Sequence, residues 1–113
     1  MAVEILWPFG LADEQAMTAT GAQAITITDR LTLIDGVTVQ ATGNRTLNLT
    51  IGSGVAVGSI IHVTDKTAAT QTLVFGTGIT SATITGASGK THVQSFIYTG
   101  TAFVAMGGDQ QID

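Results

Sequence analysis

The chain has 113 residues, no cysteine and a net charge of -4; only 11% of its residues are charged, against 44% that are hydrophobic. This length allows one domain with a single core, and the absence of cysteine excludes disulfides and thiolate metal sites. The four basic residues are scattered, which argues against binding to nucleic acid or to an anionic membrane.

Residues 1–22 differ from the rest of the chain and are predicted to form an extended N-terminal arm. Their apolar side chains follow neither a period of two nor one of 3.6, and Pro8 is incompatible with a central strand. The candidate partner-binding residues are Ile5, Leu6, Trp7, Phe9 and Leu11. We expect this arm to insert into a neighbouring subunit, because an apolar tail that carries the only tryptophan resembles an interface anchor. The alternative is that these side chains plug the end of their own barrel.

Residues 23–107 are predicted to form an antiparallel β domain. Apolar and polar side chains alternate with a period of two, which is typical of half-buried strands. In residues 24–34 the alternation predicts four inward side chains: Ile25, Ile27, Leu31 and Leu33. The dipeptide Asp35-Gly36 predicts a two-residue hairpin, because both residues suit the positive φ of a type I′ turn.

Further strands are predicted at residues 46–51, 59–64, 71–75, 80–85, 91–98 and 102–106. In the first of these, Leu47, Leu49 and Ile51 alternate with polar residues and are predicted to face inward. Turn signals every 8 to 12 residues or so favour a single antiparallel β-sandwich or barrel, jelly-roll-like. Residues 108–113 are predicted to be a polar C-terminal tail. A β-solenoid is a minor alternative, since similar alternating segments recur without a fixed period.

Motifs for catalysis or ligand binding are weak. Residues 86–91 end like a phosphate-binding loop, but Ile84 stands where the first glycine should be, and a strand-like pattern follows instead of a helix. His62, Asp65 and His92 could supply a metal site only if the fold placed them on one face. We expect instead that both imidazoles lie on exposed or subunit-facing strand positions.

Carboxylate chemistry is equally weak in the sequence. A glycosidase pair would need Asp29 to face Asp35 or Asp65 across a sugar, and nothing in the spacing requires it. No Gly-x-Ser-x-Gly motif is present. We therefore expect that the protein is not an enzyme and uses no cofactor. Phe96, Tyr98 and Phe103 are predicted to meet across the final hairpin.

Four segments carry a resemblance to a known class of proteins: residues 58–65 (GSIIHVTD), 71–76 (QTLVFG), 84–86 (ITG) and 95–103 (SFIYTGTAF). Together they resemble small β-rich virion proteins of tailed bacteriophages, namely head decoration (cement) proteins and β modules of fibres. The resemblance covers roughly residues 52–106 and consists mainly of the pattern of short strands and the turns between them.

The resemblance implies a structural virion protein that binds the major capsid protein and stabilises neighbouring capsid subunits through its arm. It also implies a homo-oligomer, with a trimer favoured, that is assembled in the host cytoplasm and located in the virion. The alternative is a carbohydrate- or receptor-binding β module of a phage fibre or tail, which would place polar side chains on loops such as residues 76–81.

Overall fold

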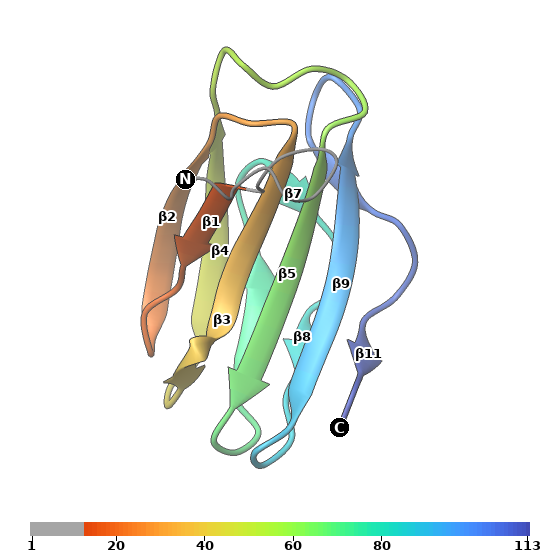
Figure 1. The fold of residues 1–113 in the computed structure, drawn as a ribbon. Coiled ribbons are helices and arrows are strands. Elements are labelled where there is room, and N and C mark those ends of the chain that lie inside the picture. The colour runs from red at the N-terminus through yellow and green to blue at the C-terminus, as the bar shows by residue number, and fades with distance from the viewer. Residues whose placement is uncertain (1–12) are drawn as a thin grey trace, which may run out of the picture.

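The computed structural model describes residues 13–113, which form eleven strands and no helix (Figure 1). No helix that could span a membrane occurs in this part of the chain. In chain order the strands are β1 (Asp13–Ala16), β2 (Gly21–Ile27), β3 (Leu31–Ala41), β4 (Arg45–Ile51), β5 (Ile60–Thr67), β6 (Thr72–Phe75), β7 (Ile79–Thr80), β8 (Ile84–Thr85), β9 (Thr91–Tyr98), β10 (Phe103–Ala105) and β11 (Gln110–Gln111). The predicted all-β class is confirmed.

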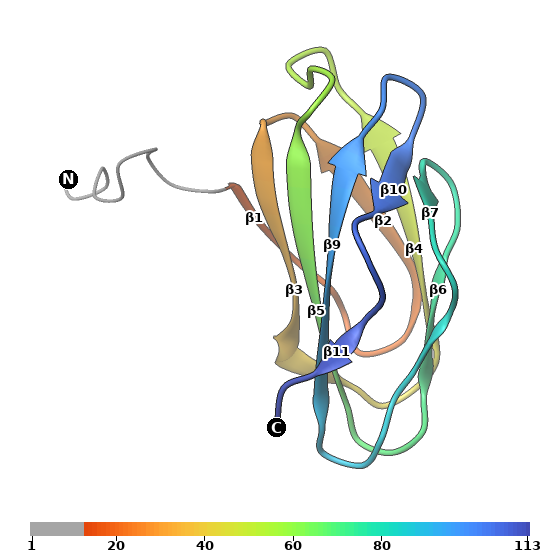
Figure 2. The ribbon, with the colours of Figure 1, turned by 90° about the vertical axis from the view of Figure 1, so that its right-hand side faces the viewer.

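The strands form two sheets that lie face to face (Figure 2). Sheet A has the order β1-β3-β5-β9-β10-β7, with β11 also paired to β9, and sheet B has the order β2-β4-β6-β8. The core lies between the sheets and draws side chains from both. Its buried members are Met17, Ile25, Ile27, Ile34, Leu47, Leu49, Ile61, Val63, Leu73, Phe75, Ile79, Ile84, Phe96 and Phe103.

The predicted antiparallel arrangement is wrong for much of the fold. Five of the nine ladders among residues 13–113 are parallel, namely β1 with β3, β3 with β5, β2 with β4, β4 with β6, and β10 with β7. From β1 to β6 the chain alternates between the sheets, so each strand lies beside the strand two positions away in sequence. Between two neighbouring strands of one sheet the chain passes through a strand of the other sheet. It therefore enters the first sheet again in the same direction, and the two neighbouring strands are parallel. Antiparallel pairing begins where β8 joins β6 in sheet B, and in sheet A where β9 joins β5.

The predicted hairpin at Asp35-Gly36 is also wrong, because both residues lie inside β3. Gly36 does not have a positive φ, so the dipeptide cannot form the type I′ turn. The Asp35 carboxylate instead accepts hydrogen bonds from the backbone N–H groups of Val37 and Thr38, at 2.8 and 3.1 Å. The register of β3 against β5 shifts between Gly36 and Ala41. The turn-forming tendency of this dipeptide is therefore expressed as a bulge in one long strand.

The predicted inward faces are partly right. Leu47 and Leu49 are buried, as predicted, and so are Ile25 and Ile27. In β3, however, the inward residues are Thr32 and Ile34, whereas Leu31 and Leu33 lie on the opposite face. Between β2 and β3 the chain leaves one sheet and enters the other, so the alternation restarts with the opposite phase.

The predicted closing hairpin is confirmed. β9 and β10 pair antiparallel, and the rings of Tyr98 and Phe103 lie 5.1 Å apart, centroid to centroid. Phe96 instead contacts Phe75 of sheet B, at 5.0 Å. The strand predicted at residues 80–85 is wrong, because β7 belongs to sheet A and β8 to sheet B. The polar tail contributes β11, which pairs with the first half of β9.

Candidate functional site

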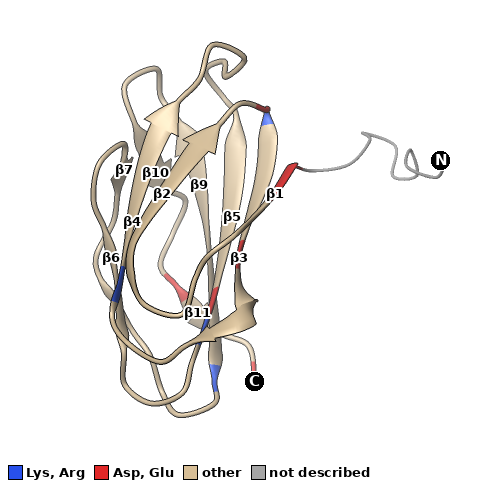
Figure 3. Ribbon diagram, turned by 90° about the vertical axis from the view of Figure 1, so that its left-hand side faces the viewer, with Lys and Arg blue, Asp and Glu red and all other residues tan. Residues whose placement is uncertain are grey.

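A row of aliphatic side chains crosses the outer face of sheet A. Leu31, Ile60, Ile97 and Val104 are successive Cα partners across β3, β5, β9 and β10. Partner residues in a ladder point to the same face. All four are partly exposed, and none belongs to the core cluster or to the side chains packed against it. We call these four residues the aliphatic row. Charged residues take up a small part of the strands of both sheets (Figure 3), and the row contains none.

The outer face of sheet B has a different character. Its positions on β2 are Ala22, Ala24 and Thr26, and those on β4 are Thr46, Asn48 and Thr50. Small and hydroxylated side chains such as these leave little continuous apolar surface. Only Val74 of β6 is a large exposed hydrophobic residue on this face. The outer face of sheet A differs in that its partly exposed aliphatic side chains are neighbours in one row, an arrangement that favours contact with an apolar partner.

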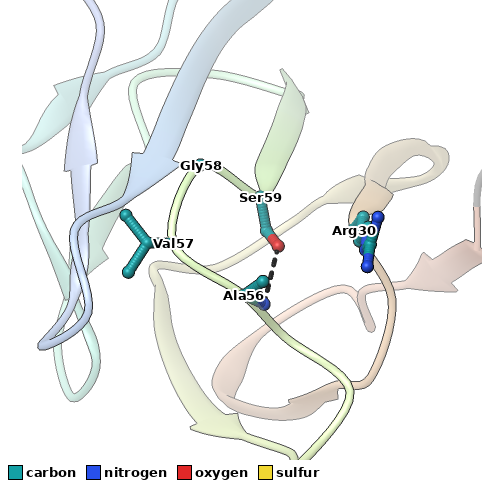
Figure 4. A pocket seen from close by; sticks show the side chains of 5 residues that line it. All are labelled: Arg30, Ala56, Val57, Gly58 and Ser59. Carbon is teal, nitrogen blue, oxygen red and sulfur yellow. Dashed lines mark hydrogen bonds between the residues drawn. The ribbon is translucent and has the colours of Figure 1, made fainter.

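A pocket adjoins the aliphatic row at the end of the molecule where β3 and β5 begin (Figure 4). Its volume is about 340 Å³, and its lining residues are Arg30, Ala56, Val57, Gly58 and Ser59. Arg30 immediately precedes Leu31, and the N–H of Ile60 donates to the Arg30 carbonyl at 2.8 Å. The Ser59 hydroxyl oxygen accepts from the Ala56 N–H at 3.1 Å. The exposed Arg30 guanidinium is therefore a cation at this end of the row, and the exposed carboxylate of Asp29 precedes it in the chain.

Val57 extends the apolar surface beside this pocket. Its side chain is 72% exposed, the largest value among the large hydrophobic residues of the described chain. Gly58, the next residue, has φ +96, which glycine adopts without strain. Val57 in this loop and Arg30 in the connection between β2 and β3 therefore place an apolar side chain and a cation at the same edge of sheet A. An arrangement of this kind suits an apolar segment that carries a carboxylate.

The predicted metal set is split by the fold. His62 is exposed on the outer face of sheet A, whereas Asp65 and His92 are ladder partners that point inward. The Asp65 carboxylate is bound by Arg45. Within residues 13–113 no group of three His, Cys, Asp or Glu side chains could hold a metal ion. The prediction for the imidazoles is right for exposed His62, but His92 is only 8% exposed.

His62 and Ser95 form a hydrogen-bonded pair, with Nδ1 and Oγ 2.7 Å apart. They face each other as ladder partners on the outer face of sheet A, one row below Ile60 and Ile97. A serine nucleophile also requires a third group to orient the base, and a hole to stabilise the oxyanion. Neither the ladder partners of His62 nor the hydrogen bonds of Ser95 supply such a carboxylate. The pair adjoins the aliphatic row, and the same face carries further polar side chains along the strands, among them Asp35, Thr64 and Lys66.

The other weak motifs lie apart from one another. Asp35 faces the outside of sheet A, while Asp65 is on the inner side of the same sheet, so they cannot flank one sugar. Asp29 lies in the connection between β2 and β3. Residues 86–90 form the turn that leads into β9, a strand and not a helix. The loop therefore lacks the helix N-terminus on which phosphate binding depends.

A buried ionic cluster was not anticipated from the sequence. Arg45 is 1% exposed, and its Nη2 contacts Asp65 Oδ1 at 2.5 Å. The guanidinium also donates to four backbone carbonyls, which belong to Thr18, Gly36, Val39 and Lys66. The signal was present in the alternation, since position 45 has the inward phase of Leu47 and Leu49. Its surroundings are occupied by backbone, so the role of this cluster is structural.

The candidate partner-binding residues of the arm, Ile5, Leu6, Trp7, Phe9 and Leu11, lie outside the described residues. The described chain begins at β1, an edge strand of sheet A. Comparison with family models, curated proteins and solved structures finds no match for this chain. The argument for function therefore depends on the outer face of sheet A, on the pocket beside it and on the sequence of the arm.

Proposed function

We propose that this chain is a structural, non-catalytic component of a virion, a decoration or cement protein that holds neighbouring subunits of a capsid together. The observation that carries the proposal is the aliphatic row, four adjacent, uncharged and partly exposed side chains that lie outside the core on the outer face of sheet A. A surface of this kind favours contact with another protein. The assignment to a virion rests on the resemblance to small β-rich proteins of tailed bacteriophages.

The arm is the second part of the proposal. Ile5, Leu6, Trp7, Phe9 and Leu11 lie within seven residues of one another, and Glu4 is the only charged residue among the first eleven. Full burial of each large apolar side chain contributes roughly 1.5–3 kcal/mol before the cost of ordering the segment. Because a shell carries many copies, weak individual contacts add up to strong retention by avidity. The major capsid protein is the proposed partner of the assembled copies.

Occupancy on assembled shells tests this function. Trp7→Ala should weaken attachment by about 2 kcal/mol, or roughly 30-fold in Kd, because a buried tryptophan is a typical interface anchor. Deletion of residues 1–11 should abolish attachment and leave the β domain folded, as measured by circular dichroism. Occupancy can be measured by electron microscopy of shells built from the major capsid protein of the same virus. Val74→Ala, on the outer face of sheet B, is the matched control. Unchanged occupancy for Trp7→Ala would contradict the proposal.

The alternative, a carbohydrate- or receptor-binding β module, has one observation in its favour. A cleft of about 210 Å³ is lined by Val93, Gln94, Ser95, Met106, Gly108 and Gln110. Amides and a hydroxyl are suitable partners for sugar hydroxyls, but no aromatic side chain lines the cleft. The Gln94 amide already donates to the Ser81 hydroxyl and to the Gly107 carbonyl. Binding to a glycan array that Gln110→Ala abolishes would favour this alternative over the capsid protein.

A further inference from the structure

We infer that the aliphatic row and the Arg30 pocket together form a receptor for the N-terminal arm of a second copy of this chain. This inference rests on the proposed function and names the neighbour that the arm engages. Copies linked in this way would meet the shell as an oligomer, with each arm on the outer face of sheet A of the next copy.

Chemical complementarity between arm and receptor is the first support. Residues 3–11 of the arm are uncharged except for Glu4, and the aliphatic row is uncharged from Leu31 to Val104. The pocket at the Leu31 end of the row carries the Arg30 guanidinium. The other basic residues do not compete for this role. Arg45 is buried, and Lys66 and Lys90 lie at the opposite end of the strands. Glu4 is therefore expected at Arg30.

The second support is the match between the length of the arm and the length of the aliphatic row. The row crosses β3, β5, β9 and β10, which are three inter-strand steps of about 4.8 Å, or about 14 Å in all. Five extended residues, joined by four Cα–Cα steps, span up to about 14 Å, which matches the row. With Glu4 at Arg30, residues 5–9 would therefore lie along the whole row and bring Phe9 near Val104. The residue before Pro8 is restricted to extended conformations, which suits this path.

The position of Asp13 argues for a second copy. Asp13 begins β1, which lies on the far side of β3 from Val104. If the arm of the same chain bound in this polarity, residues 9–13 would have to return across four inter-strand steps, about 19 Å. Four residues reach at most about 14 Å. The chain's own arm is too short to place Glu4 at Arg30 and Phe9 at Val104, whereas the arm of another copy is not limited in this way.

The contact joins two different surfaces, so its symmetry has consequences. Reciprocal exchange of arms closes a dimer, and cyclic exchange closes a trimer or a larger ring. Either arrangement covers the row on every copy.

The mass of the purified full-length chain in solution tests the inference, by sedimentation velocity between about 1 and 100 µM, the range in which contacts of micromolar Kd dissociate. We expect a closed oligomer at the higher concentrations. Ile97→Lys, in the middle of the row, should raise the dissociation constant at least tenfold, whereas Val74→Lys on sheet B should not change it. A chain that stays monomeric throughout, or equal effects of the two lysines, would overturn the inference.

Charge reversal provides a measurement that does not depend on Ile97→Lys remaining folded. Glu4→Arg alone and Arg30→Glu alone should each weaken association about fivefold, and the double variant should restore it. Failure of the double variant to recover would refute the pairing of these two residues.

Crosslinking distinguishes a second copy from the same chain. The natural chain has no cysteine, so Ile5→Cys in one population and Leu31→Cys in another should give a disulfide-linked dimer when the two are mixed. A monomeric intrachain disulfide in the doubly substituted chain, with no mixed dimer, would overturn the inference. If the chain is monomeric but Trp7→Ala still lowers shell occupancy, this inference fails and the proposed function stands. If neither effect is seen, both fail.

Discussion

Replacement of Arg45 should destabilise the fold more than neutralisation of its partner Asp65. The guanidinium is almost completely buried and serves five acceptors, the Asp65 carboxylate and the carbonyls of Thr18, Gly36, Val39 and Lys66. These carbonyls come from the β1–β2 connection, from β3 and from β5. Gly36 lies at the start of the register shift of β3, and Val39 lies within it, where the ladder to β5 is interrupted. Arg45 thus provides a donor for the Val39 carbonyl, in the part of β3 that has no ladder partner in β5.

The difference in cost follows from the number of groups that each change leaves unpaired. Asp65→Asn keeps the size of the side chain and an acceptor for Nη2 but leaves the guanidinium without its counter-charge, at a cost of about 3 kcal/mol. Arg45→Met leaves a buried carboxylate without its donor and also removes the donor of four carbonyls. Each unpaired buried carbonyl costs about 1 kcal/mol or more, so the total should exceed about 5 kcal/mol. That loss is comparable with the whole stability of a small domain.

Urea unfolding at pH 7, followed by far-UV circular dichroism, measures both variants. Lys66→Met is the matched control, because Lys66 lies on the outer side of the same strand beside Asp65, and its loss should change the free energy of unfolding by less than about 0.5 kcal/mol. If Asp65→Asn costs as much as Arg45→Met, the ion pair and not the set of carbonyls is the main contribution of Arg45, and the reasoning is refuted.

Two further predictions concern the bulge in β3. A hydrogen bond from the Thr38 hydroxyl, helped by the N–H groups of Val37 and Thr38, lowers the pKa of Asp35. The stabilisation by this carboxylate is therefore present above the unfolded-state pKa near 3.8 and is lost as the pH falls through the lower folded-state value. Asp35→Asn should flatten the acid side of a Tm-against-pH curve below about pH 5, and an unchanged curve would contradict this. A Cβ at Gly36 would overlap the Thr64 carbonyl oxygen and lie 2.9 Å from Arg45 Nη2, so Gly36→Ala should cost about 1–3 kcal/mol in urea unfolding. Gly108→Ala, where a Cβ meets nothing within 4 Å, is its control, and equal costs for the two would show that the close packing is not limiting.

The strands were easier to predict than their partners. The alternation of Leu47 and Leu49 with polar residues identified β4 and its inner face, because burial of one sheet face imposes a period of two whatever lies beside the strand. That period is the same in parallel and antiparallel ladders, so it could not show that β4 lies parallel to β2 and β6. The hairpin predicted at Asp35-Gly36 was wrong for a related reason. The local tendency to turn was real, but the pairing of β3 with β5 on both sides of it kept the strand continuous.

The aliphatic row, like the strand directions, could not be predicted from the sequence. Leu31, Ile60, Ile97 and Val104 are spread over 74 positions of sequence, and each alone is an ordinary strand residue. They become one row only because three ladders bring them into register. Arg45 was predictable as an inward position from its phase, but its acceptors come from segments as distant as Thr18 and Lys66. No local sequence pattern could predict hydrogen bonds between residues so far apart in the chain.

The sequence by itself determined that the chain is β-rich, that turns fall at its glycines near positions 43, 76 and 89, and that its leading segment is apolar and nearly uncharged. These properties depend on side-chain chemistry and on neighbours within a few residues. Only the tertiary structure decided strand direction, the burial of Arg45 and the apolar outer face of sheet A. Those features arise from contacts between residues far apart in the chain, whose register is fixed when the two sheets close on a common core.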